Sequence, residues 1–246
     1  MDIYLVYETI FIVLAAIVFI ISIVSSFCFR KLFYIINFFA FLNILVVLIV
    51  RTVLSKHLPY SSFYETLLFL SFIYNLKISF ISKYPVKTKG ILIVPVVIML
   101  ISCLIVPSSL KEISELNPIF NSMWFNIHIP AFMIGYLSII SAFVLNLLDI
   151  SRIYQNESYI FEMKIATIFT LIGLISGSIW AKEAWGSYWS WDPKEIGALI
   201  IFILTSIFLF VKNKKSQFII SILTILVLFI TYFGLSFLVS GLHSYK

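Results

Sequence analysis

Tryptophan is concentrated in one short stretch of this 246-residue chain. Four of its five tryptophans lie within twelve residues of the run WAKEAWGSYWSWDPKE, at Trp180, Trp185, Trp189 and Trp191. An indole has a large rigid apolar face and a single N–H to satisfy, so several indoles in one segment favour a flat, apolar ligand. Aromatic residues also gather at membrane interfaces, and packing between helices explains any single indole here equally well.

The spacing of the aromatic residues in this run also favours a flat ligand. Trp185, Tyr188 and Trp189 stand at positions i, i+3 and i+4, so a helical turn would place them on one face. Gly186 has no side chain and would let a ligand approach the backbone closely.

Two of the three histidines, His128 and His243, flank the tryptophan segment. Neutral imidazoles are common ligands of haem iron, and two of them reaching an indole platform from opposite sides could supply both axial ligands. The indoles would then cover the macrocycle. Isolated loop histidines are usually solvated, however, and an aromatic apolar pocket also suits a quinone or a lipid. The residues alone leave these alternatives open.

The end of the tryptophan run has the pattern of a helix start. The residues Asp192, Pro193, Lys194 and Glu195 fit the N-cap, N1, N2 and N3 positions of a capping box. We therefore expect Asp192 to shape the segment rather than to perform chemistry. Lys182 and Lys194 could pair with haem propionates, although solvated interfacial lysines are common.

The composition of the chain indicates the class of protein to which these residues belong. The chain is 62% hydrophobic and 11% charged, with a mean hydropathy of +1.11, which predicts an all-α integral membrane protein. Apolar runs predict a polytopic bundle of about eight transmembrane helices, forming a single domain over 1–246. The expected helices span residues 5–27, 32–50, 63–82, 90–106, 127–149, 164–180, 195–211 and 217–239. Residues 180–195 form the loop between the sixth and seventh.

Several classes of protein are disfavoured. The first apolar run lacks a basic leader and is too long for a signal peptide. Cys28 and Cys103 are far apart and form no CxxC motif, so neither a disulfide framework nor a thiol redox site is indicated. The formal charge of +6 is scattered among short loops, which does not favour nucleic acid as a partner.

The distribution of charge orients the helices instead. With both termini outside, the inner loops hold eleven of the seventeen basic residues, as the positive-inside rule requires. His57, His128, His243 and the tryptophan segment then all face outward. His128 is expected to open the fifth helix, so that no histidine lies within a span. Glu65 is expected in the first turn of the third helix, where an acid suits the helix dipole.

Several motifs together resemble one known family. The run WAKEAWGSYWSWDPKE is similar to the WWD signature of the cytochrome c biogenesis proteins called CcsA or ResC. The runs YSSFYETLLFLSF, WFNIHIPAFMIGYLS around His128 and SGLHSYK around His243 are similar to further motifs of that family, in the same order.

This resemblance implies a subunit of the system II holocytochrome c synthase, a haem lyase. His128 and His243 match the external histidines that ligate haem b, and 180–192 matches the segment that holds it. Expected partners are a CcsB or ResB-like membrane protein, apocytochrome c with its CxxCH motif, and a thiol-reducing thioredoxin-like protein. The expected location is an energy-transducing membrane, either the bacterial inner membrane or the thylakoid, with the haem site on the periplasmic or lumenal side.

The chain departs from the family pattern in its seventh helix. Phe210 stands where typical members have a histidine within the membrane, and Ile196 and Gly197 replace a common threonine and tryptophan. Two related interpretations stay open: a CcmC-like haem carrier, which also uses two external histidines, and a HemX-like regulator of haem biosynthesis without transfer activity. A cytochrome b-like quinol oxidoreductase is disfavoured because it requires histidines inside spans.

Overall fold

The computed structural model describes residues 3–113 and 116–234, and over these residues the secondary structure is entirely helical. His243 lies outside the described residues. The long helices are α1 (Ile3–Cys28), α2 (Arg30–Ser55), α3 (Phe63–Leu76), α4 (Val86–Ile105), α5 (Met123–Ile150), α6 (Ser158–Trp185), α7 (Pro193–Phe210) and α8 (Lys214–Phe229). Each coincides with one predicted span, which confirms an all-α polytopic membrane protein.

Seven helices in the described part are long and apolar enough to cross a membrane. The exception is α3, which has 14 residues but continues directly into a π-helical turn, Lys77–Ile81. The two segments together match the predicted span 63–82. A second π-helical turn, Ile230–Gly234, extends α8.

The predicted helix ends are less accurate than the predicted centres. Helix α2 continues to Ser55 instead of residue 50, α5 begins at Met123 instead of 127, and α6 continues to Trp185 instead of 180. An apolar run marks only the part of a helix that meets hydrocarbon, whereas polar residues continue the same hydrogen-bond ladder beyond it.

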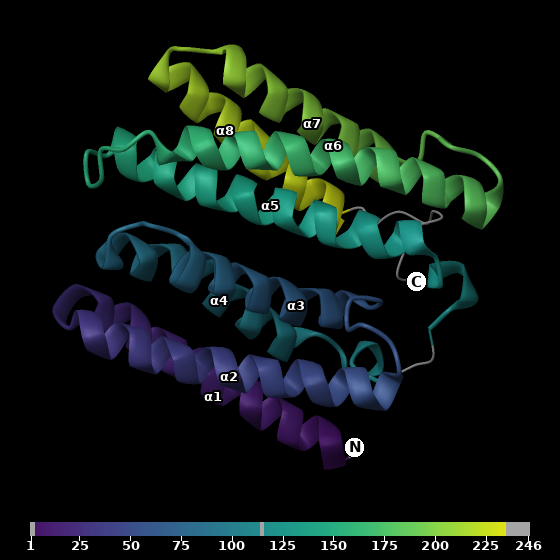
Figure 1. Cartoon of the computed structure of the whole chain (residues 1–246), viewed down its shortest axis with the longest axis horizontal. Helices are drawn as coiled ribbons and strands as arrows, with labels where there is room; N and C mark the ends of the chain where they lie inside the picture. Colours follow the sequence, from purple (N-terminus) through teal and green to yellow (C-terminus); the bar gives the residue numbers. More distant parts are fainter. Residues whose placement is uncertain (1–2, 114–115, 235–246) are drawn as a thin grey trace. The chain divides into compact units, whose positions relative to one another are not determined.

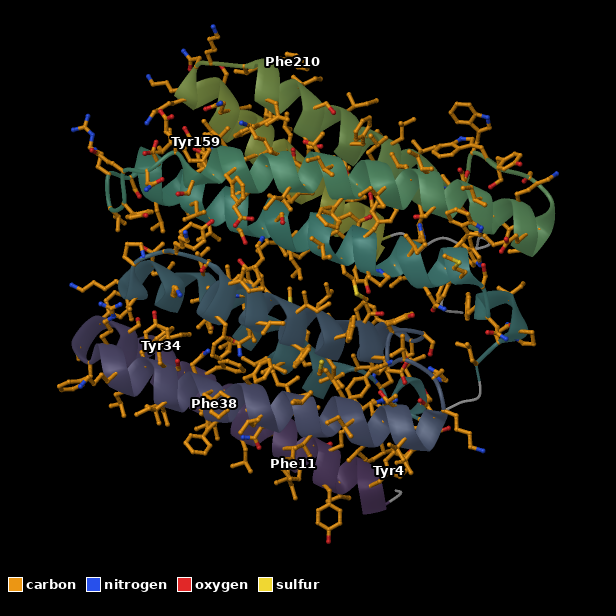
Figure 2. The ribbon with its side chains drawn as sticks, viewed as in Figure 1. Tyr4, Phe11, Tyr34, Phe38, Tyr159 and Phe210 are labelled. Atoms are coloured by element: carbon orange, nitrogen blue, oxygen red, sulfur yellow. The ribbon has the colours of Figure 1, made fainter. Side chains whose placement is uncertain are left out.

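Contacts divide the chain into two compact units, Met1–Asn117 and Pro118–Lys246. In unit 1, α1 packs against α2 and α4, and α3 packs against α4 and α2 (Figure 1). Apolar side chains project from the outer faces of these helices, as Figure 2 shows for Phe38. Phe38 is 46% exposed and Ile17 is 49% exposed. Such faces suit contact with lipid.

In unit 2, the 28-residue helices α5 and α6 form the most extensive pair, with α8 packed on α5 and α7 packed on both α6 and α8 (Figure 1). Glycines allow the close approach of α5 and α6. A Cβ atom at Gly135 would lie 3.0 Å from the Thr170 methyl group, and one at Gly173 would lie 2.7 Å from the Phe132 ring. Small residues at helix contacts are typical of membrane bundles.

Candidate functional site

His128 lies in the second turn of α5, about one turn further in than expected, because α5 begins at Met123 instead of residue 127. The expectation that it opens the helix was therefore wrong, and the side chain is half-buried within a helix. Its Nδ1 lies 2.9 Å from the carbonyl oxygen of Gly173 on α6. A carbonyl can only accept, so Nδ1 carries the proton, and Nε2 of the neutral ring has the lone pair that can bind a metal.

Packing fixes the plane of the His128 imidazole as well. The ring stacks on the Trp180 indole at 5.7 Å and 26°, and meets the Phe132 ring edge to face at 5.1 Å. On α6 it lies directly over Gly177, where a Cβ atom would come within 2.4 Å of Nδ1. The bare backbone of Gly177 therefore makes the space that the imidazole occupies.

The first two tryptophans belong to the end of α6 rather than to a loop. Trp180 is buried, and its Nε1 donates to the carbonyl of Ile119 at 3.0 Å. Trp185 packs edge to face on it at 5.0 Å. Gly186 then ends the helix in a left-handed conformation, φ +86°, and its N–H returns to the carbonyl of Lys182. The connecting loop is therefore only 186–192, shorter than the predicted 180–195.

This helix end corrects a second expectation. Trp185 and Trp189 do not share a helical turn, because Gly186 breaks the helix between them. Trp189 instead pairs with Trp191, edge to face at 5.9 Å. The Nε1 of Trp189 is buried and has no hydrogen-bond partner among the described residues. Tyr188 is exposed, with the Lys182 ammonium 5.6 Å from its ring centre.

The capping box at the start of α7 is confirmed. Asp192 Oδ1 accepts from the backbone N–H of Lys194 at 2.8 Å, and Glu195 Oε2 accepts from that of Asp192 at 3.2 Å. Glu195 Oε2 also accepts from the N–H of Ser190 at 2.8 Å. These two bonds bracket Trp191, which is 69% exposed and has φ +60°, a conformation unfavourable for a bulky residue. The cap thus holds an exposed indole in place.

The structure therefore brings some of the candidate residues of unit 2 into contact with one another, but not all of them. His128, Trp180 and Trp185 form one contiguous cluster, and Trp189 and Trp191 form a pair in the loop that follows. Lys182 lies at the start of that loop, where its Nζ donates to the carbonyl of Gly186 at 2.7 Å. His243, the second expected iron ligand, is not among the described residues.

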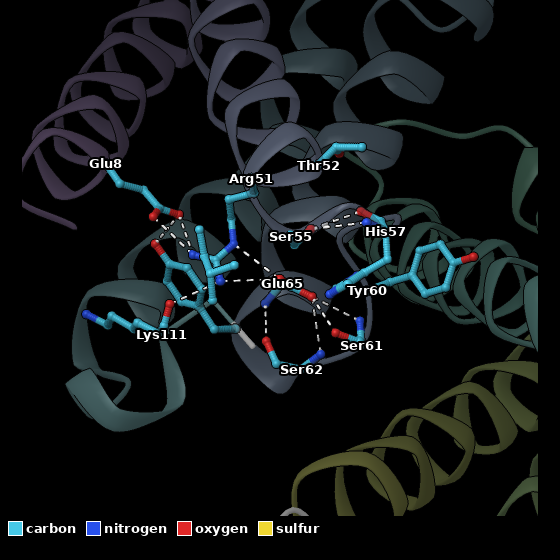
Figure 3. Close-up of polar contacts among 12 residues, drawn as sticks. Glu8, Arg51, Thr52, Ser55, His57, Tyr60, Ser61, Ser62, Glu65 and Lys111 are labelled. Carbon is cyan, nitrogen blue, oxygen red and sulfur yellow. Dashed lines mark hydrogen bonds and ion pairs between the residues drawn. The ribbon is translucent and has the colours of Figure 1, made fainter. Parts of the chain in front are cut away.

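The sequence interpretation missed a buried ionic cluster in unit 1. Arg51 directly follows the span predicted over residues 32–50, but it lies inside α2 and is 1% exposed. Its guanidinium pairs with Glu8 of α1 at 3.0 Å and with Glu65 of α3 at 3.2 Å (Figure 3). It also donates to the backbone carbonyl of Lys111 at 3.0 Å. A single arginine following an apolar run, with a single glutamate in another span, was the available signal.

Glu65 has a second role, which the sequence did predict. It forms a capping box with Ser62 at the start of α3, and its Oε2 accepts from the backbone N–H and the hydroxyl of Ser61 (Figure 3). The segment 56–62 before α3 carries His57, whose Nδ1 lies 2.9 Å from the carbonyl oxygen of Leu58. Burial raises the pKa of Tyr60 in the same segment. Glu65 thus connects this segment to the ionic cluster.

Comparison with known proteins gives one consistent result. Residues 60–243 match the family described as Cytochrome C assembly protein. The chain is 30% identical to the cytochrome c biogenesis protein CcsA of Welwitschia mirabilis, with 84% of each chain covered. It is 31% identical to the CcsA protein of Chlamydomonas reinhardtii, over 83% of this chain and 65% of that one.

Among solved structures, the fold is similar to that of a protein named cytochrome c haem lyase CcmF. The TM-score is 0.69 at 17% identity, and the match covers 92% of this chain but 45% of the other. At this identity the likeness concerns the fold alone. The family match begins after α2, so the helices that supply Glu8 and Arg51 precede the matched segment, whereas Glu65 lies within it.

Proposed function

The chain belongs to the cytochrome c assembly protein family and has a role in cytochrome c biogenesis; from this premise, we propose that it holds haem b and presents it to CxxCH apocytochrome c for covalent attachment. It would act as the haem-binding subunit of a system II synthase, beside a CcsB-like membrane protein. The proposed haem site faces the outer side of an energy-transducing membrane.

The observation that carries this proposal is the state of His128. Ligating histidines almost always donate their other ring N–H to a carbonyl or carboxylate, which fixes the ring and increases ligand basicity. His128 has this arrangement, with Nδ1 bonded to the Gly173 carbonyl and the ring plane fixed by Trp180 and Gly177. Nε2 is therefore the proposed iron ligand. We assign the opposite axial position to His243 because both histidines match the family motifs.

The indoles are proposed to orient the macrocycle. Trp185, Trp189 and Trp191 present apolar faces at the start of the loop and along it, and the buried Trp180 supports Trp185 and His128 from behind. The buried Nε1 of Trp189 lacks an acceptor among the described residues, and a propionate carboxylate would supply one. Gly186, Tyr188 and Asp192 would shape this shelf, while Lys182 and Lys194 lie where propionates could pair with them.

The chemistry asked of these side chains is positioning. Each cysteine thiol of the apocytochrome adds across a haem vinyl group: sulfur bonds to one carbon and the hydrogen goes to the other, with no net oxidation. A fixed ring orientation brings the vinyl edges to the incoming thiols, and this gain in proximity is a recognised source of rate enhancement. No side chain need act as acid, base or nucleophile.

We predict that the protein purified with its partner contains b-type haem with a low-spin, bis-histidine spectrum. Replacing both His128 and His243 with alanine is expected to abolish that spectrum, because the iron loses both nitrogen ligands. His57→Ala is the matched control, since its ring is also bonded to a backbone carbonyl through Nδ1. An unchanged spectrum in the double variant would contradict the ligand assignment.

Transfer of haem can be tested separately from binding. We expect that coexpression of the chain and its partner with an exported CxxCH apocytochrome, in cells lacking their own assembly system, gives a haem-stained band that survives denaturation. Haem that remains on the cytochrome in a denaturing gel must be bound through covalent thioether bonds, because non-covalently bound haem dissociates there. If haem binds normally but no covalent cytochrome forms, the chain is a carrier or a regulator and not a synthase subunit.

A further inference from the structure

Lys89 is a buried cation in unit 1 without a counter-ion among the described residues. It lies in the first turns of α4 and is 5% exposed. Its Nζ donates to the backbone carbonyl of Ser79 at 2.9 Å and lies 5.4 Å from the centre of the Tyr34 ring. The ion pairs found in the described part of the chain involve Arg51 and Lys214 instead. A buried charge normally has a partner, so this ammonium indicates that an anion is missing.

The polar groups around Lys89 also have an excess of hydrogen-bond donors over acceptors. Asn75 Oδ1 accepts from Asn37 Nδ2 at 2.9 Å and from the Ser79 hydroxyl at 2.7 Å. The Nδ2 of Asn75 is buried and bonds to no acceptor among the described residues. An ammonium has three N–H groups and a carboxamide has two. The cluster therefore offers more donors than acceptors, and an acceptor-rich ligand would satisfy them.

Among the described residues of unit 1, no carboxylate supplies that acceptor. Between Glu8 and Glu65, and again between Glu65 and Glu112, the sequence contains no aspartate or glutamate. Glu65 stands 14 residues before Ser79 along α3 and its π-helical turn, or roughly 21 Å at 1.5 Å per residue. Glu8 and Glu65, which share Arg51, thus lie at the opposite end of the helices from Lys89.

The surroundings of Lys89 are suited to an amphiphile. Four exposed basic residues lie at the same end of unit 1, where α1 passes to α2 and α3 passes to α4: Arg30, Lys31, Lys83 and Lys87. We call this the basic end. Exposed apolar side chains adjoin it, among them Phe29 at 64% and Ile81 at 69%. The phosphate of a lipid can pair with the cations while its acyl chains cover the apolar side chains. A free anion could make only the first of these contacts.

We propose that the basic end of unit 1 is a binding site for an anionic phospholipid, with the Lys89 ammonium and the Asn75 amide as its buried anchors. The phosphate accepts from the ammonium and the amide, and the exposed lysines and arginine surround the headgroup. The α4 N-terminus, which has no side-chain cap from Pro85, adds a favourable partial positive charge. This site is separate from the haem site and does not depend on it.

The test compares two lysines of unit 1 in the full-length protein. Lys89→Gln removes the buried charge, and Lys56→Gln removes an exposed charge at the C-terminal end of α2, away from the basic end. We expect native mass spectrometry of the wild type and of Lys56→Gln to show retained phosphatidylglycerol. Retention by Lys89→Gln should fall about tenfold, the loss expected for one charge-assisted hydrogen bond. Equal retention by the two variants would overturn the proposal.

Two further measurements distinguish the source of the phosphate and do not depend on the folding of Lys89→Gln. The melting temperature of delipidated wild-type protein should rise with phosphatidylglycerol and stay unchanged with phosphatidylcholine. Inorganic phosphate should leave it unchanged as well. Equal stabilisation by the two lipids would show that the headgroup charge is not recognised, and stabilisation by inorganic phosphate alone would identify a simple anion site. Either result contradicts the lipid assignment.

Discussion

Replacing Arg51 with leucine is expected to destabilise unit 1 by about 3–5 kcal/mol, the usual effect of removing one member of a buried ion cluster. The substitution keeps an apolar side chain in α2. Among the described residues it leaves the Glu8 carboxylate with only the Tyr64 hydroxyl, which donates to it at 2.9 Å. Glu65 loses its ion pair too, and keeps its bonds to Ser61 and Ser62. A loss of this size shows directly as a lower melting temperature in detergent.

Arg30→Leu provides the matched control for this effect. Arg30 begins the same helix and is exposed, so its loss should change the melting temperature little. Adding Glu8→Gln to Arg51→Leu should recover part of the stability, because it removes one unpaired buried charge. If Arg51→Leu is as stable as Arg30→Leu, the cluster does not connect α1, α2 and α3 as the geometry indicates.

This cluster shows why sequence patterns locate helices better than they locate contacts. Each predicted span depended on its own apolar run. The free energy of transferring such a run into the membrane is favourable whichever helices lie next to it. The Arg51 and Glu8 pair joins residues 43 positions apart on different helices. No local pattern links them, and a lone arginine at the edge of an apolar run is as consistent with a loop as with a span.

Within the tryptophan segment, too, one feature was predicted correctly from the sequence and others were not. The capping box of Asp192 and Glu195 depends on neighbouring residues only, and the sequence predicted it correctly. The helix was expected to stop near Trp180, since the apolar run weakens there, yet Lys182 and Glu183 continue it to Gly186. Gly186 was interpreted as a place for close ligand approach, and its φ of +86° shows in addition that it ends α6.

The surroundings of His128 could not have been predicted from spacing alone. The sequence identifies the imidazole as a candidate ligand, but the carbonyl that fixes its tautomer belongs to Gly173, 45 residues away. Gly177 is four residues further along α6, and in the sequence it is one of several small residues in that helix. Its role becomes visible only when α5 and α6 are packed together, because the His128 ring then fills the space over its backbone.

Gly177→Ala is therefore expected to weaken haem binding while unit 2 stays folded. The added methyl group would lie 2.4 Å from Nδ1 of His128, so the ring must move and give up its hydrogen bond to Gly173. Overpacking of a tight contact costs about 1–3 kcal/mol, which corresponds to a loss of haem affinity of roughly tenfold to a hundredfold. Haem titration of the purified protein, followed through the low-spin absorbance, measures this loss.

Gly135→Ala separates this effect from a general loosening of the helix pair. It adds the same methyl group between α5 and α6, but its Cβ meets the Thr170 methyl group at 3.0 Å and not the imidazole. A lower melting temperature with normal haem affinity is expected for Gly135→Ala, and reduced haem affinity for Gly177→Ala. If the two variants lose haem to the same extent, haem binding depends on the overall packing of the helices. If neither does, the orientation of His128 seen here is not the one that binds iron.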